Sequence, residues 1–287
     1  MNLSILYRGP LSSCNYGCTY CPIAKRTETK LEHHGDEQAL ERFLNWVEVQ
    51  RDKHTLSIFF TPWGEALIHR RYQQAFVRLT HLPHVEKVSI QTNLSCRLQW
   101  VEDCDKSRMA LWTTYHPGEV KRERFLARCQ ELIERNVAFS VGVVGMQEHL
   151  DEIECVRAAL PKEIYVWVNA YKRLPNYYTA QDLQRLENVD SLFPLNNVRH
   201  ESKGKPCRTG ESVFSVDGEG VMRRCHFVRD PIGSIYTENW EDALKPRVCS
   251  NDTCGCHIGY IHMPDLKLDD VFGKGMLERI PKYAQSK

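Results

Sequence analysis

Three cysteines near the start of the chain have the spacing of metal ligands. Cys14, Cys18 and Cys21 follow the pattern Cys-x3-Cys-x2-Cys. Three thiolates can hold three irons of a 4Fe–4S cluster, which leaves the fourth iron open to a small molecule. Zinc is an alternative, but structural zinc usually takes four ligands and no nearby fourth donor follows. A disulfide would leave one thiol over. The spacing therefore favours a cluster that does more than carry an electron.

A second group of five cysteines lies between residues 207 and 256. Its members are Cys207, Cys225, Cys249, Cys254 and Cys256. The first two flank a predicted β-hairpin with an Asp217-Gly218 turn, and thiols around a hairpin can staple a small domain to a metal. Four thiols saturate one 4Fe–4S cluster and leave one spare. Cys254 and Cys256 are closely spaced for two ligands of one cluster, so Cys249 with either of them would complete the set. Zinc remains the alternative metal.

The composition of the whole chain narrows the class of protein. Its 287 residues carry 38 Lys and Arg against 37 Asp and Glu, a net charge of +1, which is not typical of a protein that binds nucleic acid through its overall charge. No apolar run is long enough to span a bilayer, and the N-terminus becomes polar too soon for a signal peptide. Twelve cysteines in such a chain indicate a reducing compartment, so we expect a cytoplasmic protein. Cys96, Cys104, Cys129 and Cys155 are interpreted as structural thiols.

Predicted strands and helices alternate up to about residue 192. The strands are expected at 3–7, 56–61, 87–93, 109–115, 137–144 and 164–169. The helices are expected at about 37–51, with Asp36 as the N-cap, and at 72–82, 119–135, 150–160 and 180–192. This alternation predicts an α/β fold with a parallel sheet. Periodicity alone does not choose between a partial barrel and a doubly wound sheet.

Several polar residues fall at the ends of the predicted strands. They are Gly64 and Glu65 after strand two, Thr92 and Asn93 at strand three, Thr114 and His116 at strand four, and Asn169 at strand six. Both candidate folds place active sites at the carboxyl ends of parallel strands. We therefore expect these side chains to surround the first group of cysteines.

In this setting the loop from Cys14 to Cys21, with the aromatic Tyr20 directly before the last cysteine, resembles the signature of the radical S-adenosylmethionine (SAM) superfamily. The resemblance covers nearly the whole chain. It implies a partial (β/α)6 barrel and a 4Fe–4S cluster whose open iron is chelated by SAM. It further implies that an electron cleaves SAM to methionine and a 5′-deoxyadenosyl radical, which abstracts a hydrogen atom from the substrate.

The same resemblance implies roles for individual residues. Trp63-Gly64-Glu65 resembles the Gly-Gly-Glu turn that holds the SAM amino group, with Trp in place of the first Gly. Other residues are similar in position to contacts of the SAM methionyl group, ribose and adenine. They are Thr92, Asn93, Thr114, Asn169 and Tyr20. Catalytic roles fall to Cys14, Cys18, Cys21 and His116, which would lie above SAM. His116 would touch the substrate or exchange protons, or else be an ordinary loop residue.

The pattern Cys207-x12-Gly220-x4-Cys225 resembles the start of the SPASM and twitch extensions of radical SAM enzymes. Five thiols fit the shorter twitch type, with one auxiliary 4Fe–4S cluster. The expected domains are a barrel at 1–195, a twitch-like α+β domain at 196–265 and a tail at 266–287.

The resemblance implies an enzyme that modifies or oxidises a peptide side chain. One alternative is a dehydrogenase of a small metabolite; another is a non-catalytic iron–sulfur electron carrier or zinc-stabilised binding module. The expected partners are a peptide or small-molecule substrate and an electron donor such as flavodoxin or ferredoxin. Neither a membrane nor a nucleic acid is expected as a partner.

Overall fold

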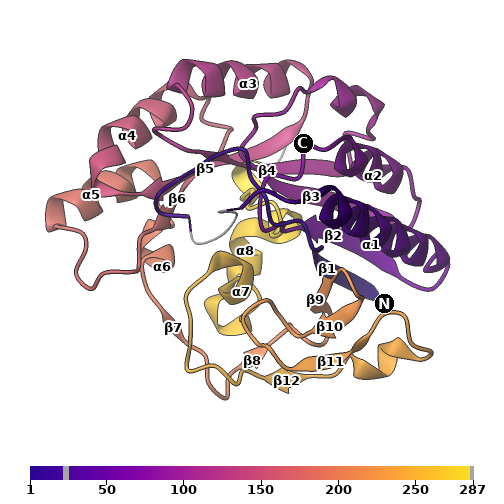
Figure 1. Cartoon of the computed structure of the whole chain (residues 1–287). Helices are drawn as coiled ribbons and strands as arrows, with labels where there is room; N and C mark the ends of the chain where they lie inside the picture. The colour runs from indigo at the N-terminus through magenta and orange to yellow at the C-terminus, as the bar shows by residue number, and fades with distance from the viewer. Residues whose placement is uncertain (22–25, 285–287) are drawn as a thin grey trace.

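Six parallel strands form the centre of the molecule. The computed structural model describes residues 1–21 and 26–284 (Figure 1). The strands are β1 (Asn2–Arg8), β2 (Thr55–Phe60), β3 (Val85–Thr92), β4 (Met109–Tyr115), β5 (Ala138–Gly145) and β6 (Val166–Ala170). They pair in chain order, each parallel to the next. A doubly wound sheet reverses its strand order at a switch point. The sequential order therefore confirms the expected partial barrel.

Helices cover one side of this sheet, forming an arc outside the strands (Figure 1). They are α1 (Lys30–Val49), α2 (Arg70–Thr80), α3 (Arg122–Glu134), α4 (Leu150–Ala159) and α5 (Ala180–Val189). Phe43 of α1 and Phe76 of α2 are fully buried in the core between helices and sheet. Since such crossovers return each strand to the same edge, all the strands present their carboxyl ends at one face of the molecule.

Helix α1 begins earlier than the sequence predicted. Thr29 caps it by accepting a hydrogen bond from the Glu32 amide, and the Glu32 carboxylate accepts from the Thr29 amide at 2.8 Å. This capping box satisfies two free amides at once, which explains the earlier start. The prediction of Asp36 as the N-cap was wrong. Asp36 lies inside the helix, fully buried, and accepts hydrogen bonds from the Leu11 amide and the Tyr72 hydroxyl.

The C-terminal segment fills the opposite face of the sheet. Short helices α7 (His257–Tyr260) and α8 (Leu268–Phe272) lie at the centre of the molecule, in yellow in Figure 1. Phe272 and Leu277 pack in one apolar cluster with the inward-facing Trp112 and Trp167. The tail expected from residue 266 onward is therefore packed into the core as far as Ile280, whereas Tyr283 is exposed. Residues 285–287 of that tail lie outside the described residues.

The predicted hairpin is confirmed, and it extends the sheet. Strand β9 (Val213–Asp217) pairs parallel with β1 and antiparallel with β10 (Val221–Arg223), which pairs with β11 (Pro231–Ser234). Two short ladders join β7 (His200–Glu201) to β13 (Thr253–Cys254) and β8 (Pro206–Cys207) to β12 (Arg247–Val248). The four-residue helix α6 (Phe193–Asn196) precedes them. Because Asp217 of β9 lies opposite Arg8 of β1, the turn of the hairpin is at the carboxyl edge of the sheet, and Cys207 and Cys225 flank the open end of the hairpin.

Among the described residues, no helix is both long enough and apolar enough to span a membrane.

Candidate functional site

The loop from Cys14 to Cys21, called here the cysteine loop, follows β1 at the carboxyl edge of the sheet. Cys18 is buried, whereas Cys14 and Cys21 are partly exposed. Burial is the main cause that raises the pKa of Cys18 to about 11, and burial also raises the pKa of Cys14, with the nearby Cys21 thiol adding to each shift. The three thiols thus lie within electrostatic range of one another. Binding a metal would require them to lose their protons, as thiolate ligands do.

Contacts with the turn after β2 fix the start of the cysteine loop. The Glu65 amide donates a hydrogen bond to the Ser13 carbonyl at 3.1 Å. A Cβ atom on Gly64 would lie only 1.7 Å from the same oxygen. On the other side, the buried Glu28 carboxylate accepts from the Ser12 amide at 2.7 Å and the Ser13 hydroxyl at 2.5 Å. The loop therefore begins from a position held on both sides.

The buried carboxylate of Glu65 ties the ends of β2 and β3 together. It accepts hydrogen bonds from the Leu67 amide at 3.1 Å, the Thr92 hydroxyl at 2.8 Å and the Asn93 amide at 2.5 Å. Burial raises its pKa to about 7, and these three hydrogen bonds act in the opposite direction. Thr92 also accepts from the Leu94 amide, so its hydroxyl is engaged on both sides.

The end of β3 touches the cysteine loop through Asn93. Its side-chain amide donates to Asn15 Oδ1 at 3.0 Å and lies 3.9 Å from Cys14 Sγ. Asn15 in turn donates to the Ser95 hydroxyl at 3.0 Å. Neither Asn15 nor Ser95 is among the residues predicted from the sequence. The position of Asn15, between two candidate ligands, was the available signal.

His116 packs against the cysteine loop. Its Nδ1 atom lies 2.8 Å from the Tyr20 hydroxyl and 3.4 Å from Cys18 Sγ. The His116 and Tyr20 rings are nearly parallel, with centroids 6.0 Å apart. Burial lowers the pKa of His116 to about 4, so it is neutral at physiological pH. Tyr20, which was expected beside adenine, is thus a loop residue in contact with His116. His116, which was expected to take part in the chemistry, lies against the loop.

The remaining strand-end residues provide open polar groups. Thr114 is partly exposed and Asn169 is exposed. In residues 1–21 and 26–284, neither side chain has a hydrogen-bond partner. The neighbouring Thr113 differs, because it is buried and its hydroxyl donates to the Ser140 carbonyl at 2.7 Å. Of the two threonines at this end of β4, Thr114 is thus the one available to a ligand.

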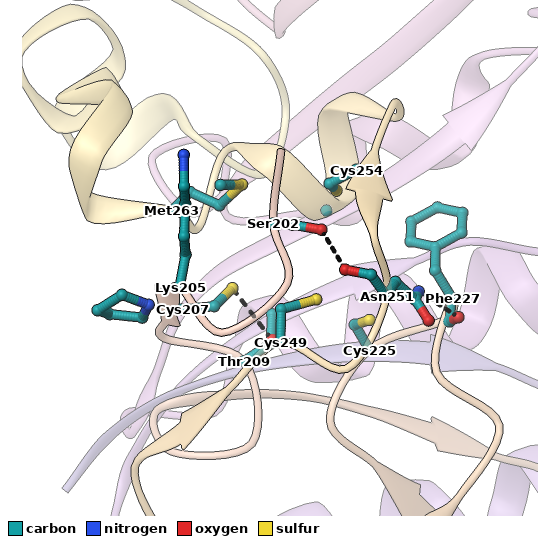
Figure 2. A pocket seen from close by; sticks show the side chains of 12 residues that line it. Ser202, Lys205, Cys207, Thr209, Cys225, Phe227, Cys249, Asn251, Cys254 and Met263 are labelled. Atoms are coloured by element: carbon teal, nitrogen blue, oxygen red, sulfur yellow. Dashed lines mark hydrogen bonds between the residues drawn. The ribbon is translucent and has the colours of Figure 1, made fainter. Parts of the chain in front are cut away.

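A separate pocket gathers four of the later cysteines (Figure 2). Cys207, Cys225, Cys249 and Cys254 all line it, together with small polar residues such as Ser202 and Thr209. The cysteines come from separate segments: Cys207 ends β8, Cys225 follows β10 and Cys254 ends β13. Cys249 forms a β-bridge with Lys203. The short ladders therefore place four thiols around one space.

Buried polar contacts hold this cysteine pocket. The Thr209 hydroxyl donates to Cys207 Sγ at 3.2 Å, as Figure 2 shows. The buried Arg224 donates to the same hydroxyl and to the carbonyls of Arg247 and Val248. Sulfur ligands of this number suit an iron–sulfur cluster or zinc. No three His, Cys, Asp or Glu side chains among the described residues are gathered closely enough for a single metal ion.

Cys256 does not line the cysteine pocket. It is partly exposed, and Gly255, just before it, accepts a hydrogen bond from Lys172 Nζ at 2.6 Å. Burial raises the pKa of Cys256, while the positive charges of Lys172, Arg279 and Arg8 act to lower it. The next residue, His257, is buried with its ring against Trp112, so it packs in the core rather than toward the cysteine pocket. All twelve cysteines are free thiols.

No protein-family model and no curated protein matches the chain. Among solved structures, native anSMEcpe with bound AdoMet (SAM) and the Cp18Cys peptide has a TM-score of 0.56 and 16% sequence identity, over 85% of this chain and 80% of that chain. The complex with the Kp18Cys peptide has a TM-score of 0.57 and 15% identity, over 85% and 80%. Native anSMEcpe with AdoMet alone gives 0.56 and 15%, over 84% and 80%. At such identities, these matches establish a shared fold.

Proposed function

We propose that this chain is a radical SAM enzyme in which Cys14, Cys18 and Cys21 hold a 4Fe–4S cluster. When bound, such a cluster supplies the electron that cleaves SAM and so produces the radical that takes a hydrogen atom from the substrate. One observation carries the proposal: the cysteine loop is fixed at the carboxyl edge of the parallel sheet by Ser13, packed on Gly64. Solved structures with the same fold contain AdoMet.

Residues around the loop have complementary roles in this proposal. Thr114 and Asn169 offer free polar groups to the ribose and the adenine end of SAM, with Tyr20 beside the base. Asn93 holds the loop, through Asn15, and would contact the methionyl group of SAM. Glu65 Oε2 accepts one hydrogen bond, from the Asn93 amide, so this oxygen could accept a second one from the SAM ammonium. A neighbouring ammonium would favour the ionised carboxylate.

The cysteine pocket is the proposed site of an auxiliary 4Fe–4S cluster, held by Cys207, Cys225, Cys249 and Cys254. All four side chains line the same pocket, which supports this set of ligands. Cys256, which lies outside it, is the proposed spare thiol. The proposed twitch-like unit spans residues 196–265, and its hairpin continues the sheet of the barrel.

The leading substrate is a peptide side chain that is modified or oxidised. The anSMEcpe structures with bound peptides support this choice, since they share the fold. A small-molecule dehydrogenase is the second candidate for the same site. Either reaction needs a reductant, and a flavodoxin or ferredoxin is the proposed electron donor. A reducing, cytoplasmic environment would suit the free thiols.

The test is anaerobic purification, followed by iron and sulfide analysis and incubation with SAM and dithionite. We expect 5′-deoxyadenosine to form. Iron without 5′-deoxyadenosine would leave only an electron carrier, and zinc in place of iron would favour a binding module. The Cys14/Cys18/Cys21→Ala triple variant is the matched control, and we expect it to retain about half of the iron, since each 4Fe–4S cluster holds the same number of irons.

A further inference from the structure

Cationic side chains from distant parts of the chain converge around the turn at Gly255 and Cys256. Lys172, after β6, donates from Nζ to the Gly255 carbonyl at 2.6 Å and to the Asn196 carbonyl. Arg279 lies over the Trp167 ring at 4.5 Å and over Trp112 at 5.9 Å. It is only 1% exposed. Its charge acts on Lys172, which places the two cations in electrostatic range.

Arg8, at the end of β1, is the third cation of this site, because its charge acts on Cys256 together with those of Lys172 and Arg279. Its Nε atom donates to the Thr61 carbonyl at 2.7 Å, and its guanidinium stacks over the Trp63 ring at 4.1 Å. In the part of the chain that the structure describes, its two Nη groups have no hydrogen-bond partner. A guanidinium held flat in this way presents a fork that matches a carboxylate.

Two of the three positive charges have no partner carboxylate among the described residues. Among residues 1–21 and 26–284, no carboxylate forms an ion pair with Arg8 or Lys172. Arg279 is paired with Asp190 at 4.0 Å, and this carboxylate also accepts from the Tyr165 hydroxyl and the Val168 amide. Burial lowers the pKa of Lys172 to about 8 and that of Arg8 to about 10, as expected for cations short of partners. Unpaired buried charge is costly, so an anionic ligand would stabilise the site.

The cationic site adjoins both groups of proposed ligands. Arg8 is on the strand that leads into the cysteine loop. The Thr61 carbonyl accepts from Arg8, and the Thr61 hydroxyl lies 2.7 Å from Nε2 of His226, the residue after Cys225. A ligand held by Arg8 would therefore lie between the cysteine loop and the cysteine pocket.

We propose that Arg8, Lys172 and Arg279 bind a carboxylate group of the substrate. This inference rests on the proposed function for the identity of the bound molecule as a substrate. It adds that the substrate is an anion, either a small carboxylic acid or a peptide with an acidic side chain or free C-terminus. SAM also carries a carboxylate, so the test separates the two sources.

The test uses the anaerobic, cluster-loaded protein and compares alkylation of Cys256 by iodoacetate and by iodoacetamide. These reagents differ in charge at similar size. The ratio of the two rates at Cys256, measured by peptide mass spectrometry, is compared with the ratio at Cys155, an exposed thiol on α4. We expect the iodoacetate preference at Cys256 to be about tenfold higher, since a buried cationic site concentrates anions by that order. The substitutions Arg8→Gln and Lys172→Gln are each expected to remove most of this iodoacetate preference. Equal ratios at the two cysteines would overturn the proposal.

Repeating the measurement with saturating SAM assigns the anion. A preference for iodoacetate that persists with SAM supports a substrate carboxylate. Its loss would mean that SAM fills the site, which overturns the assignment to substrate.

If Cys256 reacts with neither reagent, the unfolding temperature decides. At equal ionic strength, succinate is expected to raise the unfolding temperature of the wild type, whereas succinamide is not. Succinate is not expected to raise that of Lys172→Gln. Equal effects of succinate on the two proteins would refute the site. Neither assay needs SAM cleavage, so the failure of this proposal is distinguishable from failure to form 5′-deoxyadenosine.

Discussion

The carbonyl oxygen of Ser13 lies against Gly64, so close that a Cβ atom added to Gly64 would be 1.7 Å from it. The adjacent Glu65 amide donates to that same oxygen. One glycine thus lets the cysteine loop pack directly on the turn after β2. A side chain there would meet backbone, which cannot rotate away as a flexible side chain can.

Gly64→Ala is expected to displace the cysteine loop. Because the clash is with the backbone of Ser13, we expect the variant to lose the iron of the first cluster, about half of the total, together with 5′-deoxyadenosine formation. Iron analysis of the anaerobic protein measures the first loss. Gly35→Ala is the matched control, since nothing lies within 4 Å of the added methyl group, and its iron content should equal that of the wild type. Full iron in Gly64→Ala would show that the loop tolerates the methyl group.

Cys254→Ala and Cys256→Ala are expected to differ although the residues are two apart. Cys254 lines the cysteine pocket and Cys256 does not. We therefore expect Cys254→Ala to lose about half of the iron and Cys256→Ala to keep all of it. Iron and sulfide analysis, with electron paramagnetic resonance of the reduced protein, distinguishes them. The reverse pattern would make Cys256 the ligand and Cys254 the spare thiol.

Glu65 is expected to make stability depend on pH. Burial raises its pKa from 4.5 to about 7. Between these values the folded protein retains a proton that the unfolded chain has released, so the free energy of unfolding falls as pH rises through this window. Relative to Glu65→Gln, we expect the wild type to lose about 1 to 3 kcal/mol between about pH 5 and about pH 7.5. Thermal unfolding of both proteins across this range measures the difference.

The same experiment has an internal control. Saturating SAM is expected to reduce the pH dependence, because its ammonium would favour the ionised Glu65. A difference between wild type and Glu65→Gln that stays constant from about pH 5 to about pH 7.5 would contradict the raised pKa.

Asp36→Ala tests whether this residue is a buried anchor or a helix cap. Asp36 is fully buried and forms an ion pair with Arg71 at 2.8 Å, so removing its carboxylate is expected to cost about 3 to 5 kcal/mol. Thr29→Ala, at the true N-cap, is expected to cost about 1 kcal/mol. Urea unfolding measures both. The exposed Glu37→Ala is the control, expected within about 0.5 kcal/mol of the wild type. Equal losses for Asp36 and Thr29 would contradict the buried-anchor role.

Much of the barrel was predictable because its signals are local. The expected strand at 109–115 coincides with β4, and the Asp-Gly turn correctly marked the hairpin. The start of α1 was missed because Asp36 satisfied the pattern of a cap, although Thr29 and Glu32 formed the better one. The burial of the C-terminal segment was also missed. Its partners, such as Trp112 and Trp167, are far away in sequence, and no local pattern records them.

The sequence by itself determined the spacing of Cys14, Cys18 and Cys21, the parallel α/β class and the strand ends at which Glu65, Asn93 and Thr114 lie. These follow from side-chain periodicity and from distances along the chain. Only the tertiary structure decided which later cysteines share a pocket, and that Arg8, Lys172 and Arg279 meet near Cys256. Such meetings depend on the course of the sheet from β9 to β6 and on the packing of the C-terminal segment against it. Those contacts are set by long-range burial, which residue spacing does not encode.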